Sequence, residues 1–487
     1  MISLSSEQKI AFDKFKNGEN LFITGPGGTG KTKLIHDMVE YMNIRGIKYQ
    51  VCAMTGCAAV LLGKCKARTL HSWSGIKLAN GPPYKIVHSV LLNKFATREW
   101  KGIKVLIVDE VSMMSRKIFD ILDLIGKSIK TSPKPFGGIQ VIFTGDFYQL
   151  PPVDKAGEIE STQFCFESDR WLSVFPLKNH IELKTMFRQS DPIYIKILSQ
   201  IRKGEIDKES IEILSKYVKR EFISTEGLKP TKLFSVRTKT DFVNKSQYDK
   251  IEEPEFVFNM KTDTDFTTYI DSKKSISTED LENCSKLTSL EIQFQIEKIM
   301  ETRNISEKLQ LKKGAIIMCT ANIDMDNSIC NGAQGIIIDF EIGTKLPIVL
   351  FSNRIKKTID YEYFQSTDYP TICIGQIPLC LAWALTIHKI QGASLNIADM
   401  DLGNTIFEYG QTYVALSRVR TLEGLYLSAF NPTRIKANPL VKEFYSRIPE
   451  PEPESIIDIK EEKTNIFQSF ALEPEEYIDP TIKRIKL

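Results

Sequence analysis

Residues 25–32, Gly-Pro-Gly-Gly-Thr-Gly-Lys-Thr, have the spacing of a phosphate-binding loop, G-x-x-x-x-G-K-[ST]. Glycines let the backbone wrap closely around an oxyanion, and the N-terminus of a following helix adds a favourable field. In this pattern Lys31 reaches the β- and γ-phosphates of a nucleotide, and Thr32 holds Mg²⁺. The sequence therefore predicts a nucleotide site built from Gly25, Pro26, Gly27, Gly28, Thr29, Gly30, Lys31 and Thr32.

Two neighbouring carboxylates, Asp109 and Glu110, follow the apolar residues 105–108. Asp109 can complete the magnesium shell, and Glu110 can orient and deprotonate an attacking water. Such a pair could instead face solvent at the end of a strand, but the phosphate loop upstream favours the hydrolytic interpretation. A polar residue beyond the next apolar stretch, residues 139–144, can touch the γ-phosphate and sense its loss, and Gln149 is our candidate.

These residues stand among apolar stretches and helical patterns that alternate along the first 150 residues. Strands are predicted at residues 20–24, 50–54, 104–108 and 139–144, and helices at residues 9–15, 31–43 and 118–129. Strand–helix alternation predicts a parallel α/β sheet, which we place in a first domain of residues 1–176. A long stretch with several Gly and Pro separates the second and third strands, so we expect a small inserted subdomain near residues 64–98.

The second half of the chain is expected to hold another α/β domain, formed by residues 177–250 and 381–448. An insertion separates these two pieces. Its first part, residues 251–309, is polar and predicts helices and loops, whereas the short apolar runs of residues 314–380 predict a small all-β module. The Pro- and Glu-rich residues 449–487 predict an acidic, largely disordered tail.

Composition excludes several classes of protein. The net charge is only +3, but residues 449–487 hold ten acidic and five basic residues, which leaves +8 on residues 1–448. No apolar run approaches the roughly 18 residues that span a membrane, and the first residues lack the pattern of a secretory or mitochondrial signal. The nine cysteines form no Cys-x-x-Cys pair, as is typical of reduced thiols. We therefore expect an intracellular protein of the nucleus or cytoplasm, with no membrane contact.

The order of the motifs resembles that of superfamily-1 DNA helicases, in the 5′→3′ branch with RecD and the petite-integration-frequency (Pif) helicases. The strings that carry the resemblance are residues 4–8, 53–59, 69–76, 110–122, 183–189, 376–379, 382–392 and 413–420. Residues 110–122 resemble the signature that separates the Pif branch from RecD. Residues 311–315 and 331–335 resemble the entry to an SH3-like β module.

The resemblance implies two RecA-like domains, the second interrupted by the SH3-like β module, with ATP and Mg²⁺ between them and single-stranded DNA across their top. It implies that Gln8 reads the adenine edge and that Gln391 and Gly392 couple the nucleotide to the strand. Arg188 and Arg418 are implied to act on the γ-phosphate. Because both arginines lie far from the phosphate loop in sequence, a second domain must bring them to it, which would turn hydrolysis into domain movement.

Contacts to DNA are predicted for hydroxyl and imidazole groups expected at strand ends, since such groups grip phosphates without reading sequence. These residues are Thr55, Thr69, His71, Thr386 and His388. Three aromatic residues, Trp73, Phe147 and Tyr148, could stack on bases, an interaction that tolerates any sequence. Core packing is the alternative for each of these rings.

These observations predict an ATP-dependent helicase that moves 5′→3′ along single-stranded DNA and unwinds tailed or structured duplex DNA, in replication, repair or recombination. One alternative is a DNA-stimulated ATPase that removes proteins or structures without unwinding duplexes. A second is a P-loop regulatory switch, against which the two arginine motifs argue. RNA and RNA–DNA hybrids stay open as substrates, and Phe467, Phe470 and Tyr477 in the acidic tail could dock a protein partner.

Overall fold

In the computed structural model, Met1–Pro449 form one compact unit. The structure describes residues 4–55, 58–59, 62, 65–77, 79–153, 159–222, 230–263, 278–303, 305–321, 323–324, 327, 329, 333–366, 369, 371–392, 394–395 and 397–449. The predicted acidic tail after Pro449 lies outside these residues, as do Gly56, Cys57, Asn331 and Gly332 of the motif strings. In the part of the chain that is described, no helix combines the length and apolar character needed to cross a membrane.

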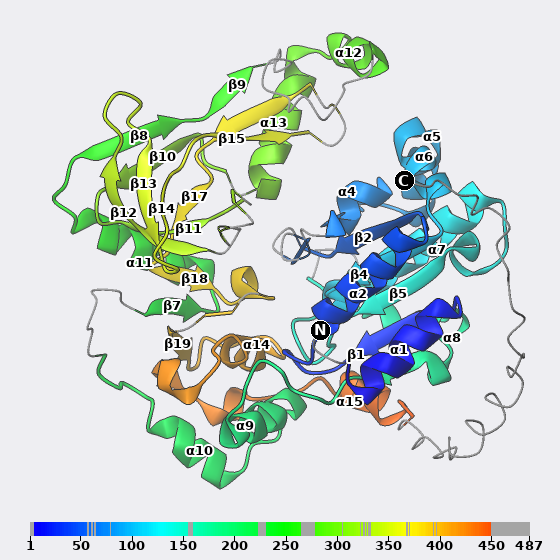
Figure 1. Ribbon diagram of the computed structural model, residues 1–487, viewed down its shortest axis with the longest axis horizontal. Coiled ribbons are helices and arrows are strands. Elements are labelled where there is room, and N and C mark those ends of the chain that lie inside the picture. The colour runs from blue at the N-terminus through cyan, green and yellow to red at the C-terminus, as the bar shows by residue number, and fades with distance from the viewer. Residues whose placement is uncertain are drawn as a thin grey trace, which may run out of the picture. The chain divides into compact units, whose positions relative to one another are not determined.

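A six-stranded parallel sheet, ordered β3-β2-β4-β5-β1-β6, forms the centre of the first lobe (Figure 1). Its strands are β1 (Leu21–Thr24), β2 (Tyr49–Ala53), β3 (Arg68–Thr69), β4 (Val105–Asp109), β5 (Gln140–Thr144) and β6 (His180–Glu182). The four predicted strands are therefore confirmed, each within one residue of its expected bounds. They were recognisable because a central parallel strand is apolar on both faces.

Helices cover both faces of this sheet. Leu21 and Ile23 share a core with α1 (Ser6–Lys16) and α2 (Lys31–Ile44), whereas Phe22 points into the opposite core. That second core contains residues of α7 (Arg116–Lys130) and α8 (Trp171–Val174). Local signals explain where two of these helices begin: Ser5 and Gln8 form a capping box on α1, and the Ser115 hydroxyl accepts from the N–H of Ile118 on α7.

Two predicted boundaries of the first lobe are wrong. The lobe does not end at residue 176, because β6 pairs with β1 and places Ile181 opposite Ile23. Helix α15 (Pro439–Ser446), which we assigned to the second domain, packs Val441 and Phe444 into the first lobe's core. The Phe444 ring stacks on Phe166 with centroids 4.4 Å apart. Both segments join the first lobe through contacts with residues distant in sequence, which a local pattern does not reveal.

In the described part of the insertion expected near residues 64–98, three helices follow β3. They are α4 (Leu70–Ser74), α5 (Pro83–Leu92) and α6 (Lys94–Gly102), and they lie in the chain between β3 and β4. Trp73 of α4 packs on Trp100 of α6 with ring centroids 4.6 Å apart. This aromatic pair gives the insertion a core that is continuous with that of the first sheet.

The second lobe has a four-stranded parallel sheet ordered β18-β7-β19-β20. Its elements are β7 (Thr231–Phe234), β18 (Ala384–Thr386), β19 (Ala398–Leu402), β20 (Leu425–Phe430), α9 (Pro192–Lys203), α10 (Lys208–Ser215), α11 (Arg237–Asp249) and α14 (Gln411–Leu416). Helices α9, α10 and α14 share a core with this sheet. The predicted fold class, α/β with two parallel sheets, is confirmed.

A separate β module interrupts the second lobe. Its antiparallel sheets are ordered β14-β13-β12-β11-β17, β10-β8 and β15-β16-β9. Their bounds, with those of two helices, are β8 (Glu255–Asn259), β9 (Lys261–Asp263), α12 (Thr278–Ser285), α13 (Ser289–Arg303), β10 (Lys308–Lys312), β11 (Ile316–Cys319), β12 (Gln334–Phe340), β13 (Pro347–Phe351), β14 (Lys356–Thr358), β15 (Glu362–Gln365), β16 (Cys373–Gln376) and β17 (Leu379–Leu381). Phe258 of β8 belongs to the core of this module, so the module begins well before residue 314. Its likeness to SH3 modules stays a prediction.

Candidate functional site

The phosphate loop follows β1 directly and leads into α2, which is the strand–loop–helix context predicted for it. Gly25 has a φ of 136° and Gly28 a φ of 96°, both in the region that favours glycine. A Cβ atom at Gly25 would lie 2.4 Å from the carbonyl oxygen of Leu183, and one at Gly28 would lie 2.6 Å from Cβ of Arg188. Backbone conformation and close packing of the segment after β6 therefore both require glycine here.

The start of α2 is suited to an anion. Gly30 at the N-cap supplies no side-chain cap, so the first N–H groups of the helix are left for a ligand. The ammonium of Lys31 donates to the carbonyl oxygens of Gly25 at 2.7 Å and Pro26 at 3.0 Å, which holds it over the loop. Burial lowers the pKa of Lys31, and nearby carboxylates oppose this shift. The loop, the helix start and the ammonium together form a cradle for phosphate.

The two carboxylates stand at the carboxyl end of β4, beside the loop. The hydroxyl of Thr144 on β5 donates to Oδ1 of Asp109, which also accepts from the N–H of Glu110 at 2.9 Å. Glu110 has a φ of 56°, a strained conformation that is often found at functional sites. Burial raises the pKa of both groups, and for Glu110 the charge of Asp109 adds to the effect. A raised pKa suits Glu110 to accept a proton near neutral pH.

Arg188 precedes α9 and Arg418 follows α14, and the structure brings both to the phosphate loop. A Cβ atom at Gly27 would lie 3.7 Å from Nη2 of Arg418 and 3.8 Å from Nη1 of Arg188. Arg188 donates to the carbonyl oxygen of Ser417 at 3.3 Å, and Arg418 donates to its hydroxyl at 2.7 Å. Burial, then the charge of Arg188, lowers the pKa of Arg418 to about 10, so the group still carries its charge at neutral pH. Two cations therefore converge on the loop from the second lobe.

Gln391 joins the two lobes at the carboxylates. It follows the 3₁₀ helix His388–Ile390, and its Nε2 donates to Oε2 of Glu110 at 3.2 Å. Its Oε1 is buried and, within the described residues, has no hydrogen-bond partner. Gly392 comes next in the chain with a φ of 85°. The segment predicted to couple nucleotide and strand thus touches the candidate base.

Two other predicted glutamines also lie at the site's edge. Nε2 of Gln8 donates to the carbonyl oxygens of Thr29 at 3.3 Å and Gly30 at 3.4 Å, so this side chain packs against the loop. Gln149 stands in the turn after β5 and is 4% exposed. Its Oε1 is buried and lacks a hydrogen-bond partner in the described part of the chain. An unsatisfied buried oxygen is consistent with a role toward a bound group.

Sequence reasoning missed two residues of the site. The hydroxyl of Tyr413 accepts from the N–H of Gly27 at 2.9 Å, in the middle of the phosphate loop. Phe187 is half exposed, and its ring carbon Cδ2 would lie 3.4 Å from a Cβ at Gly30. Tyr413 begins a motif string and Phe187 adjoins Arg188. Their place next to predicted site residues was therefore the signal in the sequence that could have identified them.

The five residues predicted to grip DNA phosphates are partly exposed. Thr69 ends β3 and Thr386 ends β18, while Thr55 lies shortly after β2. His71 lies in α4, and His388 begins its 3₁₀ helix. Burial lowers the pKa of His388. All five therefore stand at or just beyond the carboxyl ends of parallel strands.

The prediction that Trp73 and Phe147 stack on bases is wrong. Trp73 is 1% exposed and Phe147 is 2% exposed, because both rings fill the core of the first lobe. Phe147 packs on Phe22 with centroids 5.1 Å apart. Tyr148 is also buried and stacks on Tyr445 at 4.7 Å. Core packing, the alternative for each ring, is what the structure contains.

The side chains present fit a nucleoside triphosphate with Mg²⁺. The open N-terminus of α2 and the cations suit phosphates. The side-chain oxygens of Gln149 and Gln391, which have no hydrogen-bond partner among the described residues, suit polar groups or water. Thr32, exposed in the first turn of α2, and Asp109, at the end of β4, would hold the metal ion. Mg²⁺ would offset phosphate charge there.

Comparison with known proteins gives a consistent result. A family model described as PIF1-like helicase matches residues 3–212, and one described as the 2B domain of DNA helicase Pif1 matches residues 298–340. The ATP-dependent DNA helicase PIF1 of Danio rerio is 34% identical over 448 residues, which are 91% of this chain and 64% of that protein. The chain thus spans just under two thirds of that relative's length.

Two solved structures are similar over most of the chain. The crystal structure of Pif1 helicase from Candida albicans matches with a TM-score of 0.74 and 30% identity, covering 92% of this chain and 100% of that one. Pif1 helicase from Bacteroides, in complex with ADP-AlF3 and single-stranded DNA, matches with a TM-score of 0.65 and 25% identity, covering 92% and 97%. The chain therefore belongs to the PIF1-like helicase family.

Proposed function

We propose that this protein is an ATP-dependent DNA helicase that moves 5′→3′ along single-stranded DNA and separates duplex strands. One observation carries the proposal: Arg188 and Arg418 reach the phosphate loop of the first lobe from segments that lead into and out of the second lobe's helices. An ATPase site completed by a second lobe links hydrolysis to relative movement of the lobes. The relatives named as ATP-dependent DNA helicases support this assignment.

The chemistry assigns a role to each group at the site. Glu110 takes a proton from the attacking water, and Gln149 senses the γ-phosphate. Lys31, Arg188 and Arg418 offset the negative charge that develops as the phosphoryl group is transferred, and their fixed positions avoid reorganisation during the reaction. Gln391 donates a hydrogen bond to Glu110, so a shift of the second lobe would also move this hydrogen-bond partner of the catalytic base.

The DNA path is proposed to follow the carboxyl ends of the strands. Hydroxyl and imidazole groups that bind phosphates there need not read the base sequence, as a translocating motor requires. Thr386 and His388 lie only a few residues before Gln391, so strand contact and the catalytic base share one segment. Single-stranded DNA and tailed or structured duplexes are the proposed partners.

Unwinding of tailed duplexes tests this proposal. The protein, ATP and Mg²⁺ are expected to separate a duplex with a 5′ single-stranded tail and to leave one with a 3′ tail largely intact. Strand separation is followed by gel or fluorescence, with an ATP-free reaction as the control. DNA-stimulated ATP hydrolysis without separation of either duplex would support a translocase instead, and hydrolysis indifferent to DNA would support a regulatory switch.

Deletion of residues 449–487 is expected to preserve ATP hydrolysis and to tighten binding of single-stranded DNA slightly at low salt. The deletion removes ten acidic and five basic residues and leaves a chain with a charge of +8, which attracts the phosphate backbone more strongly. Binding is measured by fluorescence anisotropy between low and physiological salt. Weaker binding after deletion would instead mean that the basic end of the tail contacts DNA.

Two further expectations stay predictions. One is that the tail binds a protein partner, and the other is that the protein works in the nucleus or the cytoplasm.

A further inference from the structure

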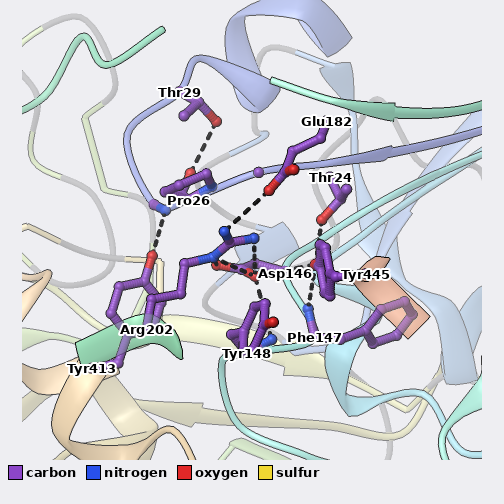
Figure 2. A network of polar contacts seen from close by, with 12 residues as sticks. Thr24, Pro26, Thr29, Asp146, Phe147, Tyr148, Glu182, Arg202, Tyr413 and Tyr445 are labelled. Atoms are coloured by element: carbon purple, nitrogen blue, oxygen red, sulfur yellow. Dashed lines mark hydrogen bonds and ion pairs between the residues drawn. The ribbon is translucent and has the colours of Figure 1, made fainter. Parts of the chain in front are cut away.

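Helix α15 places one hydroxyl between two strand ends of the first lobe. The hydroxyl of Tyr445 donates to Oδ1 of Asp146 at 3.2 Å and accepts from the N–H of Phe147 at 3.1 Å (Figure 2). It also lies 2.5 Å from Oγ1 of Thr24, which can donate to it. Thr24 ends β1 and directly precedes the phosphate loop, whereas Asp146 begins the turn after β5. One hydroxyl thus connects the start of the phosphate loop with the start of the turn after β5.

Asp146 is held from another side by Arg202 of α9. The guanidinium contacts both carboxylate oxygens, with Nε 3.1 Å from each oxygen and Nη2 3.0 Å from Oδ1, and it also pairs with Glu182 at 3.1 Å. The side chain of Asp146 is fully buried and that of Arg202 is 6% exposed. The guanidinium also lies 4.7 Å from the ring centroid of Tyr148 and 5.0 Å from that of Tyr445.

A buried ion pair of this kind is weak evidence for stability, because desolvation offsets much of its attraction. Its geometry is more informative. Arg202 approaches from α9, which shares the core of the second lobe, and Tyr445 approaches from α15, which follows the last strand of that lobe. Both side chains end on the same carboxylate of the first lobe. The contacts of Arg202 and Tyr445 with Asp146 therefore hold a segment of the first lobe in place more than they add to the free energy of folding.

The position that it fixes is that of Gln149. The carbonyl oxygen of Asp146 accepts from the N–H of Gln149 at 2.9 Å, and its carboxylate accepts from the N–H of Tyr148 at 3.3 Å. On the far side, a Cβ atom at Gly410 would lie only 2.5 Å from the carbonyl oxygen of Tyr148. The turn is thus enclosed by side chains and backbone on several sides, and Asp146 sets its shape.

We propose that Tyr445 is a positioning residue for ATP hydrolysis, which acts with Arg202 through Asp146 to hold the Gln149 turn in register with the phosphate loop. Helix α15 is then part of the ATPase machinery although it follows every recognised motif. The inference rests on the proposed function, since it assigns a role in the same hydrolytic site.

The test uses Tyr445→Phe in the whole chain of residues 1–487. Phenylalanine keeps the ring that stacks on Tyr148 and removes only the hydroxyl. The expected result is a fall of about tenfold in the kcat of DNA-stimulated ATP hydrolysis, corresponding to about 1.4 kcal/mol, with the KM for ATP changed less than twofold. Lys442→Ala, on the same helix, removes an exposed ion pair with Glu205 and is the matched control with unchanged kcat.

A second measurement separates positioning from general damage. If Tyr445 acts through Gln149, Tyr445→Phe should lower kcat much less in a Gln149→Ala background than in the wild type. Independent, multiplicative losses in the double variant would overturn the proposal, as would an unchanged kcat in Tyr445→Phe. Absence of ATPase activity in the wild type would instead refute the proposed function, so the two failures are distinguishable.

Discussion

Replacing Lys31 with alanine is expected to lower the kcat of DNA-stimulated ATP hydrolysis by about 100- to 1,000-fold and to abolish duplex unwinding. The ammonium lies over the phosphate loop, bonded to two of its carbonyl oxygens. Without it, charge that develops on the transferred phosphoryl group loses a partner at the centre of the site. Phosphate release at saturating ATP and single-stranded DNA, and strand separation on a 5′-tailed duplex, measure the two effects.

Lys33→Ala is the matched control for this prediction. Lys33 lies two residues further along α2, is exposed and pairs with Asp37 one helical turn away. Exposed pairs of this type contribute little free energy, so activity should stay at the wild-type level. A similar loss in both variants would indicate damage to α2, and full unwinding by Lys31→Ala would contradict the assignment of the site.

The ATP site was predictable because its signals are local. The phosphate loop needs glycines at positions with positive φ, and Asp109 and Glu110 follow a strand that is apolar on both faces. Each signal occupies a few consecutive residues, and spacing alone identifies it. The approach of Arg188 and Arg418 depended on the resemblance of longer strings, since nothing in either residue's immediate surroundings indicates a phosphate partner.

Burial of aromatic residues was not predictable in the same way. Trp73 stands in a motif string and Phe147 stands in the turn after β5. Their rings face inward because partners from other segments, Trp100 and Phe22, lie there. Tyr413 is the opposite case. It belongs to a helix whose residues are all buried, yet its hydroxyl reaches the phosphate loop from a position far away in sequence.

Segments that cross between lobes were the largest source of error. α15 follows the second sheet in sequence and continues its alternation of strands and helices, so its assignment to the second domain was the natural one. Its apolar face instead completes the aromatic core around Phe22 and Trp171 in the first lobe. A sequence pattern records that a face is apolar, and only the fold determines which core it enters.

Glu110→Gln is expected to lower the kcat of ATP hydrolysis by about 100- to 10,000-fold with little change in nucleotide affinity. The amide keeps the size of the side chain and can still accept from Gln391, but it cannot take a proton from water. In the wild type, kcat should fall as pH drops through the raised pKa of Glu110, at a higher pH than for an ordinary glutamate. The residual rate of the variant should lack this dependence.

The same substitution is expected to stabilise the nucleotide-free protein near neutral pH. Burial, then the charge of Asp109, raises the pKa of Glu110 in the folded state, despite the opposing effects of Lys31 and Arg418. The stability that the protonated carboxyl contributes is fully present below the unfolded pKa of about 4.3 and is lost as pH rises through the folded value. Glutamine carries no charge and avoids that loss.

The Tm of Glu110→Gln should therefore exceed that of the wild type at pH 7, and the difference should shrink as the pH is lowered. Glu209→Gln, at an exposed position on α10 with an ion pair to Lys196, is the control and should alter neither Tm nor kcat. An inactive Glu110→Gln with a lower Tm at pH 7 would mean that the carboxylate stabilises the fold. That outcome would contradict our interpretation that buried Glu110 destabilises the fold and is kept because hydrolysis requires a base.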